Sequence, residues 1–223
     1  MDTKLLKQGL IKFFSGLIII GALIFIPAGS LKFFGGWLLM GILFIPMFIA
    51  GLIMMKKCPD LLRKRLNVKE EQDEQKSVII LSALMFIASF VVAGLNYRFK
   101  WIILADWYCI WFAVIFLVAY AMYAEVLREN AYLSRTVEVQ KDQKVIDTGL
   151  YGVVRHPMYM TTFLLFLSMP LVLGSVFSFA INLLYIPIIA KRIKNEEKVL
   201  REGLPGYEEY MRKVRFKVIP YLW

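Results

Sequence analysis

The chain has 223 residues, of which 59% are hydrophobic, and its apolar runs are too long for a soluble core. This length leaves no room for a separate soluble catalytic domain beside about five or six membrane helices of roughly 20 residues each. The single His and the two Cys residues have no metal-binding spacing, so zinc, haem and non-haem iron sites are hard to assemble. We therefore expect a membrane protein with metal-free chemistry, in which the helix bundle itself forms any site.

Six apolar segments follow one another along the chain. They lie near residues 10–28, 33–55, 77–95, 101–124, 158–173 and 176–193. The first has no signal-peptide cleavage site, and we interpret it as a retained membrane helix. The last two are short and meet at 173–175, so they form either a tight hairpin across the bilayer or two tilted, partly inserted helices. The predicted fold is all-α, a polytopic transmembrane bundle of five to six helices.

The connecting segments carry their own patterns. Residues 56–76 mix charges densely and include an amphipathic piece at 61–66, which is typical of an interfacial helix. Within the polar loop 125–157, the stretch Thr136–Val139 resembles an extended piece, and Pro157 predicts the start of the next helix. This loop can fold back over the membrane face.

The C-terminal tail predicts an amphipathic helix that lies on the bundle. Its helical pattern breaks at 203–206, and Tyr207, Tyr210 and Val214 then follow at spacings of three and four. We interpret Tyr207 and Tyr210 as packing residues, because Tyr gathers at membrane interfaces for its amphipathic ring alone.

The distribution of positive charge predicts the orientation. With both termini in the cytoplasm, 24 of the 27 Lys and Arg residues lie on the inner side, and only Lys32, Arg98 and Lys100 lie outside. The net charge of +10 then reflects this bias and contact with anionic lipid headgroups of the bilayer. Nucleic acid is not an expected partner, because no soluble basic fold is present.

Two polar clusters flank the last two apolar segments. Residues 149–159 (GLYGVVRHPMY) hold the only histidine, and Arg192, Glu196 and Glu197 follow some 35 residues later. Arg192 and Glu196 are four apart, so they share one helix face and could hold a zwitterion. The alternatives are a loop that merely precedes a helix-starting proline, and an exposed ion pair. The two polar clusters are expected at the same membrane face, and this favours a functional site over both alternatives.

The motifs form a longer pattern. It comprises Gly149-x-Tyr151-x-x-x-Arg155-His156-Pro157-x-Tyr159, then Glu196-Glu197 after the apolar hairpin, then Tyr207-x-x-Tyr210 and Pro220. This pattern resembles the isoprenylcysteine carboxyl methyltransferase and phospholipid methyltransferase superfamily of integral membrane enzymes, over roughly residues 130–220. The chain would be one membrane domain, 1–223, with N-terminal helices in 1–124 and a methyltransferase-like catalytic region in 125–223.

The resemblance implies a multi-pass enzyme that transfers a methyl group from S-adenosylmethionine to a lipophilic acceptor at the cytoplasmic membrane face. The acceptor would be an isoprenylcysteine-like carboxylate, as on a prenylated substrate, or a lipid amine. The implied cofactor-binding residues are Gln143, Lys144, Val145, Ile146, Tyr151, Arg155, His156, Pro157, Met158, Tyr159 and Glu196. A histidine commonly begins this set in the family, where this chain has Gln143.

The implied catalytic residues are Arg192, Glu196 and Glu197, with no metal ion. Glu196 can take the ammonium group of the cofactor, and Arg192 can bind the substrate and orient an acceptor carboxylate. With an amine acceptor, His156 or Glu197 could remove a proton.

Two other functions remain open at this stage. A membrane NADPH-dependent sterol or enone reductase shares an Arg-His-x-x-Tyr feature, but an Asn often stands there in the place of Met158. The Glu-Glu pair and the tyrosines that follow it also favour the methyltransferases. The third alternative is a non-catalytic lipid-binding protein whose polar clusters anchor helices at the interface.

Overall fold

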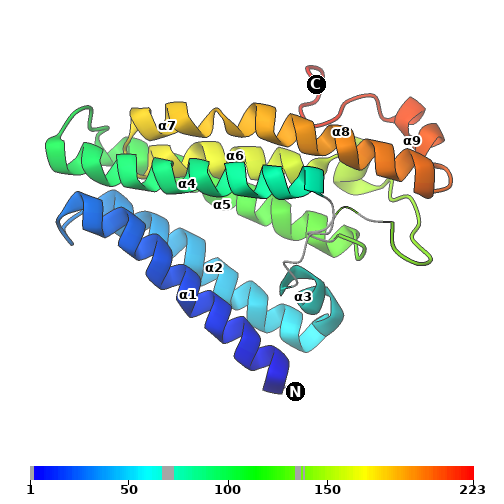
Figure 1. Ribbon diagram of the computed structural model, residues 1–223, viewed down its shortest axis with the longest axis horizontal. Helices are drawn as coiled ribbons and strands as arrows, with labels where there is room; N and C mark the ends of the chain where they lie inside the picture. Colours follow the sequence, from blue (N-terminus) through cyan, green and yellow to red (C-terminus); the bar gives the residue numbers. More distant parts are fainter. Residues whose placement is uncertain (1–2, 67–72, 134–136, 138) are drawn as a thin grey trace.

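The computed structural model describes residues 3–66, 73–133, 137 and 139–223, and all regular structure in these ranges is helical (Figure 1). The helices are α1 (Thr3–Ala28), α2 (Phe34–Lys57), α3 (Pro59–Leu66), α4 (Asp73–Phe99), α5 (Asp106–Glu129), the 3-10 helix η1 (Gly149–Gly152), α6 (Pro157–Val172), α7 (Val176–Asn182), α8 (Tyr185–Gly203) and α9 (Tyr207–Lys213). The predicted all-α class is confirmed. The extended piece predicted at Thr136–Val139 falls partly outside the described residues, because 136 and 138 are not among them.

Five helical segments are long and apolar enough to cross a membrane. They are Thr3–Ala28, Phe34–Lys57, Lys76–Phe99, Asp106–Glu129 and Val176–Gly203. The remaining apolar helix, α6, is shorter, with 16 residues. These helices identify an integral membrane protein and confirm a bundle of the predicted size.

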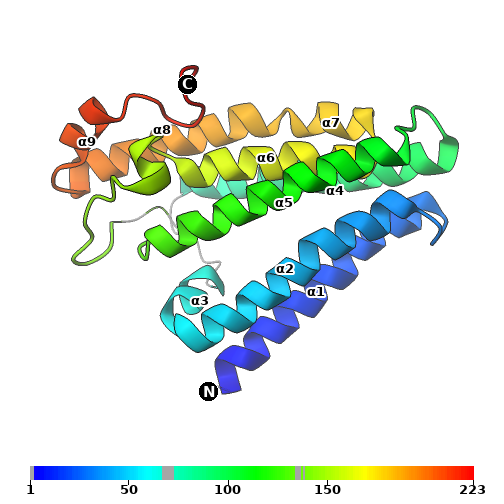
Figure 2. The same ribbon diagram turned by 180° about the vertical axis from the view of Figure 1, so that it is seen from behind.

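The last two apolar segments form a helical hairpin, in which α6 packs beside α7 and α8 (Figures 1 and 2). Gly174 occupies the turn with φ +70°, a left-handed conformation that Gly adopts without a steric cost. Ser175 then caps α7, because its hydroxyl accepts a hydrogen bond from the amide of Ser178 at 3.2 Å. The hairpin returns the chain to the end where α6 begins, so both polar clusters meet there.

A break at 183–184 separates α7 from α8. Pro187 has no N–H that could bond to the carbonyl of Leu183. The turn is closed instead by hydrogen bonds between residues three apart, such as the one from Leu184 N to Ile181 O at 3.0 Å. The amide of Asn182 donates to the carbonyl of Phe166 in α6. The break therefore interrupts the helix, although α7 and α8 run on in the same direction (Figure 1), and the bond from Asn182 ties α7 to α6.

The α1–α2 hairpin meets the rest of the bundle at the end opposite the polar clusters and diverges from it towards the N-terminus (Figures 1 and 2). Two glycines permit this contact. A Cβ at Gly94 would lie 2.6 Å from the carbonyl of Ile24, and a Cβ at Gly35 would lie 2.8 Å from that of Val172. Small residues let membrane helices approach closely, so these two positions fix where the hairpin joins.

Helix α3 confirms that the segment 61–66 is helical, and it lies at the diverging end (Figure 1). Its position at the membrane interface stays a prediction. The guanidinium of Arg65 lies over the ring of Tyr123 in α5, 5.4 Å from its centroid. Helix α3 thus connects the end of α2 with the part of the bundle that carries the polar clusters.

The orientation of the bundle is testable by single cysteines in a variant without the two native ones. We expect Lys141→Cys and Arg215→Cys, both exposed near the polar clusters, to resist an impermeant thiol reagent in intact cells and to react after lysis. Lys32→Cys is the matched control, because this exposed residue lies in the α1–α2 turn at the other end and should react in intact cells. Labelling of Lys141→Cys before lysis would reverse the predicted orientation.

Candidate functional site

The loop before α6 is shaped by one glycine and one proline. Gly149 begins η1 with φ +52°, a left-handed conformation that Gly adopts without a steric cost, and a Cβ there would also press against the carboxylate of Glu129. Pro157 occupies the first turn of α6, where a missing N–H costs nothing, and His156 precedes it as the N-cap residue. The predicted helix start at Pro157 is therefore confirmed.

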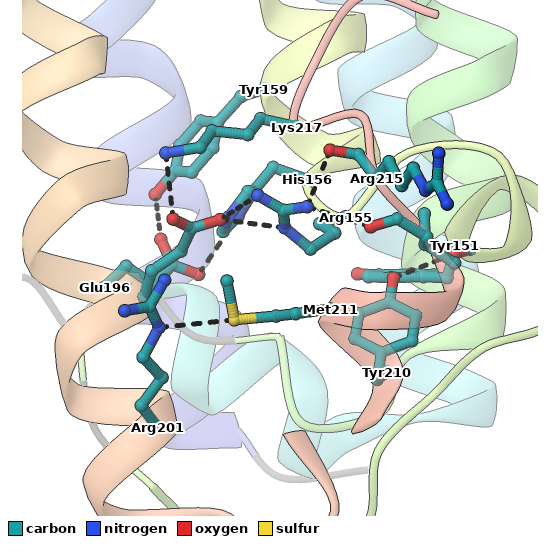
Figure 3. Close-up of polar contacts among 12 residues, drawn as sticks. Tyr151, Arg155, His156, Tyr159, Glu196, Arg201, Tyr210, Met211, Arg215 and Lys217 are labelled. Atoms are coloured by element: carbon teal, nitrogen blue, oxygen red, sulfur yellow. Dashed lines mark hydrogen bonds and ion pairs between the residues drawn. The ribbon is translucent and has the colours of Figure 1, made fainter. Parts of the chain in front are cut away.

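The C-terminal segment holds this loop in place. The backbone amides of Arg155 and His156 donate to the carbonyls of Phe216 and Lys217 at 2.9 and 2.8 Å. The Nη1 of Arg155 also donates to two further tail carbonyls, those of Val214 and Arg215, each at 2.8 Å (Figure 3). The loop and the tail, some 60 residues apart in sequence, thus form one unit.

Glu197 is the centre of a buried ion cluster. Its Oε1 accepts from Nε of Arg155 at 2.9 Å and lies 3.4 Å from Nε2 of His156, and its Oε2 lies 3.0 Å from Nζ of Lys217. Glu197 is 4% exposed and Arg155 is 8% exposed. A buried carboxylate needs such partners, because an unpaired charge is costly away from water.

The second polar group is bridged by a phenol. The Nε of Arg192 donates to the hydroxyl of Tyr159 at 2.9 Å, and that hydroxyl in turn donates to Oε2 of Glu196. Nδ1 of His156 lies 4.0 Å from the other oxygen of Glu196. The predicted shared helix face of Arg192 and Glu196 is present, and Tyr159 from α6 joins the two across the hairpin.

A solvent-open pocket lies between the loop, the start of α6, the middle of α8 and the segment 204–210. The eleven residues assigned to the cofactor from the sequence all line it, at 143–146, Tyr151, 155–159 and Glu196, and Arg192 lines it too. Glu197 is not among the described residues that line the pocket, because its carboxylate points into the ion cluster and pairs with Arg155. The structure thus brings both predicted polar clusters to one cavity.

Nine wall residues were not assigned to the site from the sequence. They are Asn130, Tyr132, Leu133, Val137, Val199, Leu200, Leu204, Tyr207 and Tyr210. Leu200 had a usable signal, because it follows Arg192 and Glu196 on one helix face. Tyr207 and Tyr210 belong to the sequence pattern, although packing is the role predicted for them. The other six have no such signal, since their place depends on how the loop and the tail fold back.

The two tail tyrosines pack as predicted and also form pocket wall. Tyr207 and Tyr210 are 4% and 5% exposed and pack with Leu204 and Val214. The hydroxyl of Tyr210 donates to the carbonyl of Tyr151 at 2.8 Å (Figure 3). Burial raises the pKa of both phenols well above its usual value, so they remain protonated donors at neutral pH.

Polar contacts position the rest of the wall. Nδ2 of Asn130 donates to the hydroxyl of Tyr151 at 2.9 Å. Nζ of Lys213 in α9 donates to the carboxylate of Asp147 at 2.7 Å, and this bond holds the pKa of that exposed carboxyl below its usual value. The loop is therefore fastened to the end of α5 through Asn130 and to the tail through Lys213. Among the described residues, no group of three or more His, Cys, Asp and Glu side chains could hold a metal ion.

The fold and the site together define a polytopic helical membrane protein whose last helical hairpin, loop and tail enclose a polar pocket at one end of the bundle. Residues 109–202 match the family model described as "Isoprenylcysteine carboxyl methyltransferase (ICMT) family". This segment runs from α5 through most of α8 and contains both polar clusters. The match confirms the resemblance noted in the sequence and supports a membrane methyltransferase. No curated protein matches the sequence.

Proposed function

We propose that the protein transfers a methyl group from S-adenosylmethionine to a lipophilic acceptor at the cytoplasmic membrane face. The observation that supports this proposal most is that one pocket gathers every residue that the family resemblance assigns to the cofactor, together with Arg192. S-Adenosylmethionine, when bound, supplies an electrophilic methyl group on a positively charged sulfur. The task of the chain is then to position the reactants and to match their charges.

The residues of the pocket fit this cofactor. Glu196, with a side chain 24% exposed, offers a carboxylate for the ammonium group. Tyr151 and Tyr159 offer aromatic rings for the adenine or for the cationic sulfur. Leu200 and Leu204 add apolar surface. This mixture of apolar walls and a few polar groups is typical of a small-molecule site.

The chemistry of the acceptor determines which side chains act on it. A carboxylate is already ionised at neutral pH and needs no base, so Arg192 would bind and orient it. An amine acceptor would have to lose a proton, and His156 lines the pocket where it could accept one. Glu197 would serve less directly, since its oxygens bond Arg155 and Lys217.

A lipophilic acceptor agrees with the position of the pocket. The wall residues Tyr159 and Arg192 belong to the apolar helices α6 and α8, so the cavity adjoins the membrane-spanning part of the bundle. The prenyl or acyl group of such an acceptor could stay in the bilayer while the polar end of the acceptor reaches Arg192.

Ligand binding tests the proposal. We expect S-adenosylhomocysteine to raise the thermal midpoint of the detergent-solubilised protein, because a ligand at about 100 times its Kd stabilises the folded state by about 2.7 kcal/mol. NADPH at the same concentration should leave the midpoint unchanged. A shift with NADPH alone would overturn the methyltransferase proposal in favour of the reductase, and a protein that responds to neither ligand would favour a non-catalytic role.

A further inference from the structure

Tyr207 stands apart from the other tyrosines of the pocket wall. It begins α9 directly after Gly206, whose φ of +84° lets the chain turn sharply, and it is 4% exposed. It belongs to an apolar cluster with Leu204, Tyr210 and Val214, against which Val145 packs. Its hydroxyl is buried and has no hydrogen-bond partner among the described residues. By contrast, Tyr210, one turn later, donates its hydroxyl to a backbone carbonyl.

An unpaired buried hydroxyl requires an explanation, because buried polar groups in folded proteins nearly always have a partner. Removing a hydroxyl from water without giving it a partner costs free energy. The phenol of Tyr207 stays protonated at neutral pH, so it is a donor that has no acceptor within the described part of the chain. The pocket that Tyr207 lines is the place from which a ligand can supply that acceptor.

We propose that the hydroxyl of Tyr207 donates a hydrogen bond to an oxygen of the ligand that fills this pocket. The inference rests on the proposed function, which supplies a nucleoside carrying an amino-acid group. Two parts of that ligand present acceptor oxygens, namely the carboxylate of the amino-acid part and the hydroxyls of the ribose. Tyr207 is thus a binding residue, whereas Tyr210 holds the loop through Tyr151.

The test compares affinity with stability in two tyrosine variants. Tyr207→Phe removes an unpaired hydroxyl, so we expect affinity for S-adenosylhomocysteine to fall about tenfold, the loss of one good hydrogen bond. The thermal midpoint of the ligand-free variant should stay unchanged or rise. Tyr185→Phe is the matched control outside the pocket, since its hydroxyl lies 2.9 Å from that of Thr162 in α6. It should lower the midpoint and leave affinity unchanged.

The outcomes separate the inference from the proposed function. If the parent binds S-adenosylhomocysteine and Tyr207→Phe binds it equally well, Tyr207 has no binding role. If the parent fails to bind it, the proposed function falls and this inference with it. S-Adenosylhomocysteine without its carboxylate distinguishes the two acceptors. If the carboxylate is the acceptor, Tyr207→Phe will bind this analogue as tightly as the parent does. If a ribose hydroxyl is the acceptor, Tyr207→Phe will still bind the analogue more weakly than the parent.

Discussion

Arg155→Met is expected to lower the free energy of unfolding by about 3–5 kcal/mol, because it leaves the buried carboxylate of Glu197 without its closest guanidinium. The change also removes the donor to the carbonyls of Val214 and Arg215, which would then lie unpaired. For a chain of this length the thermal midpoint should fall by roughly 6–20 °C. Thermal unfolding of the solubilised protein measures the effect.

Arg128→Met is the matched control for Arg155→Met. Arg128 also pairs with a carboxylate, that of Glu125 at 2.6 Å, but both side chains are largely exposed. Exposed pairs add little to stability, so this variant should unfold near the parent midpoint. Equal midpoints for the two variants would show that the cluster around Glu197 does not hold the loop.

The difference in stability expected between these two variants follows from the structural role of Arg155 in the Arg-His-Pro motif. Arg155 lines the pocket, yet its side-chain nitrogens are bonded to Glu197 and to the tail. Glu197 likewise bonds cations of the loop and the tail. Part of the sequence pattern therefore builds the frame of the site, whereas the neighbouring Glu196, whose side chain is 24% exposed, lines the pocket in which we propose that a ligand binds.

The helices could be predicted from the sequence because apolar runs of this length have few other structures available in a membrane. Apolar runs alone could not decide whether the last two segments form a tight hairpin or two tilted, partly inserted helices. The choice depended on the turn at Gly174 and on the cap by Ser175, whose effects require three-dimensional context. The separation of α7 from α8 likewise follows from Pro187, which could have kinked the helix or ended it.

The pocket could be predicted in part. The residues at 155–159 and at Glu196 carry a readable motif, and the structure places them in one wall. The contacts of the tail could not be predicted, because the acceptors are backbone carbonyls, such as those of Phe216 and Lys217, and a carbonyl has no sequence signature. The role of Lys217 beside Glu197 was hidden for a related reason, since a lone cation in a basic tail has many possible partners.

A second pair of variants separates the two sides of the proposed site. We expect Glu196→Gln to weaken binding of S-adenosylhomocysteine by about 10- to 100-fold, because it replaces a charged acceptor for the ammonium group with a neutral one. Isothermal titration measures the affinity. Glu202→Gln, an exposed carboxylate farther along α8, is the matched control and should bind like the parent. Equal affinities for these two variants would remove Glu196 from the cofactor site.

Arg192→Ala should leave that affinity within about threefold of the parent and lower turnover by at least tenfold, because it would remove a group that orients only the acceptor. The bridge through Tyr159 makes this a demanding test, since one hydroxyl connects Arg192 to Glu196. Without Arg192, Tyr159 can still donate to Glu196 and keep the carboxylate in place. If Arg192→Ala instead weakened binding as much as Glu196→Gln, the three side chains would act as one unit, and the assignment of separate cofactor and acceptor roles would be wrong.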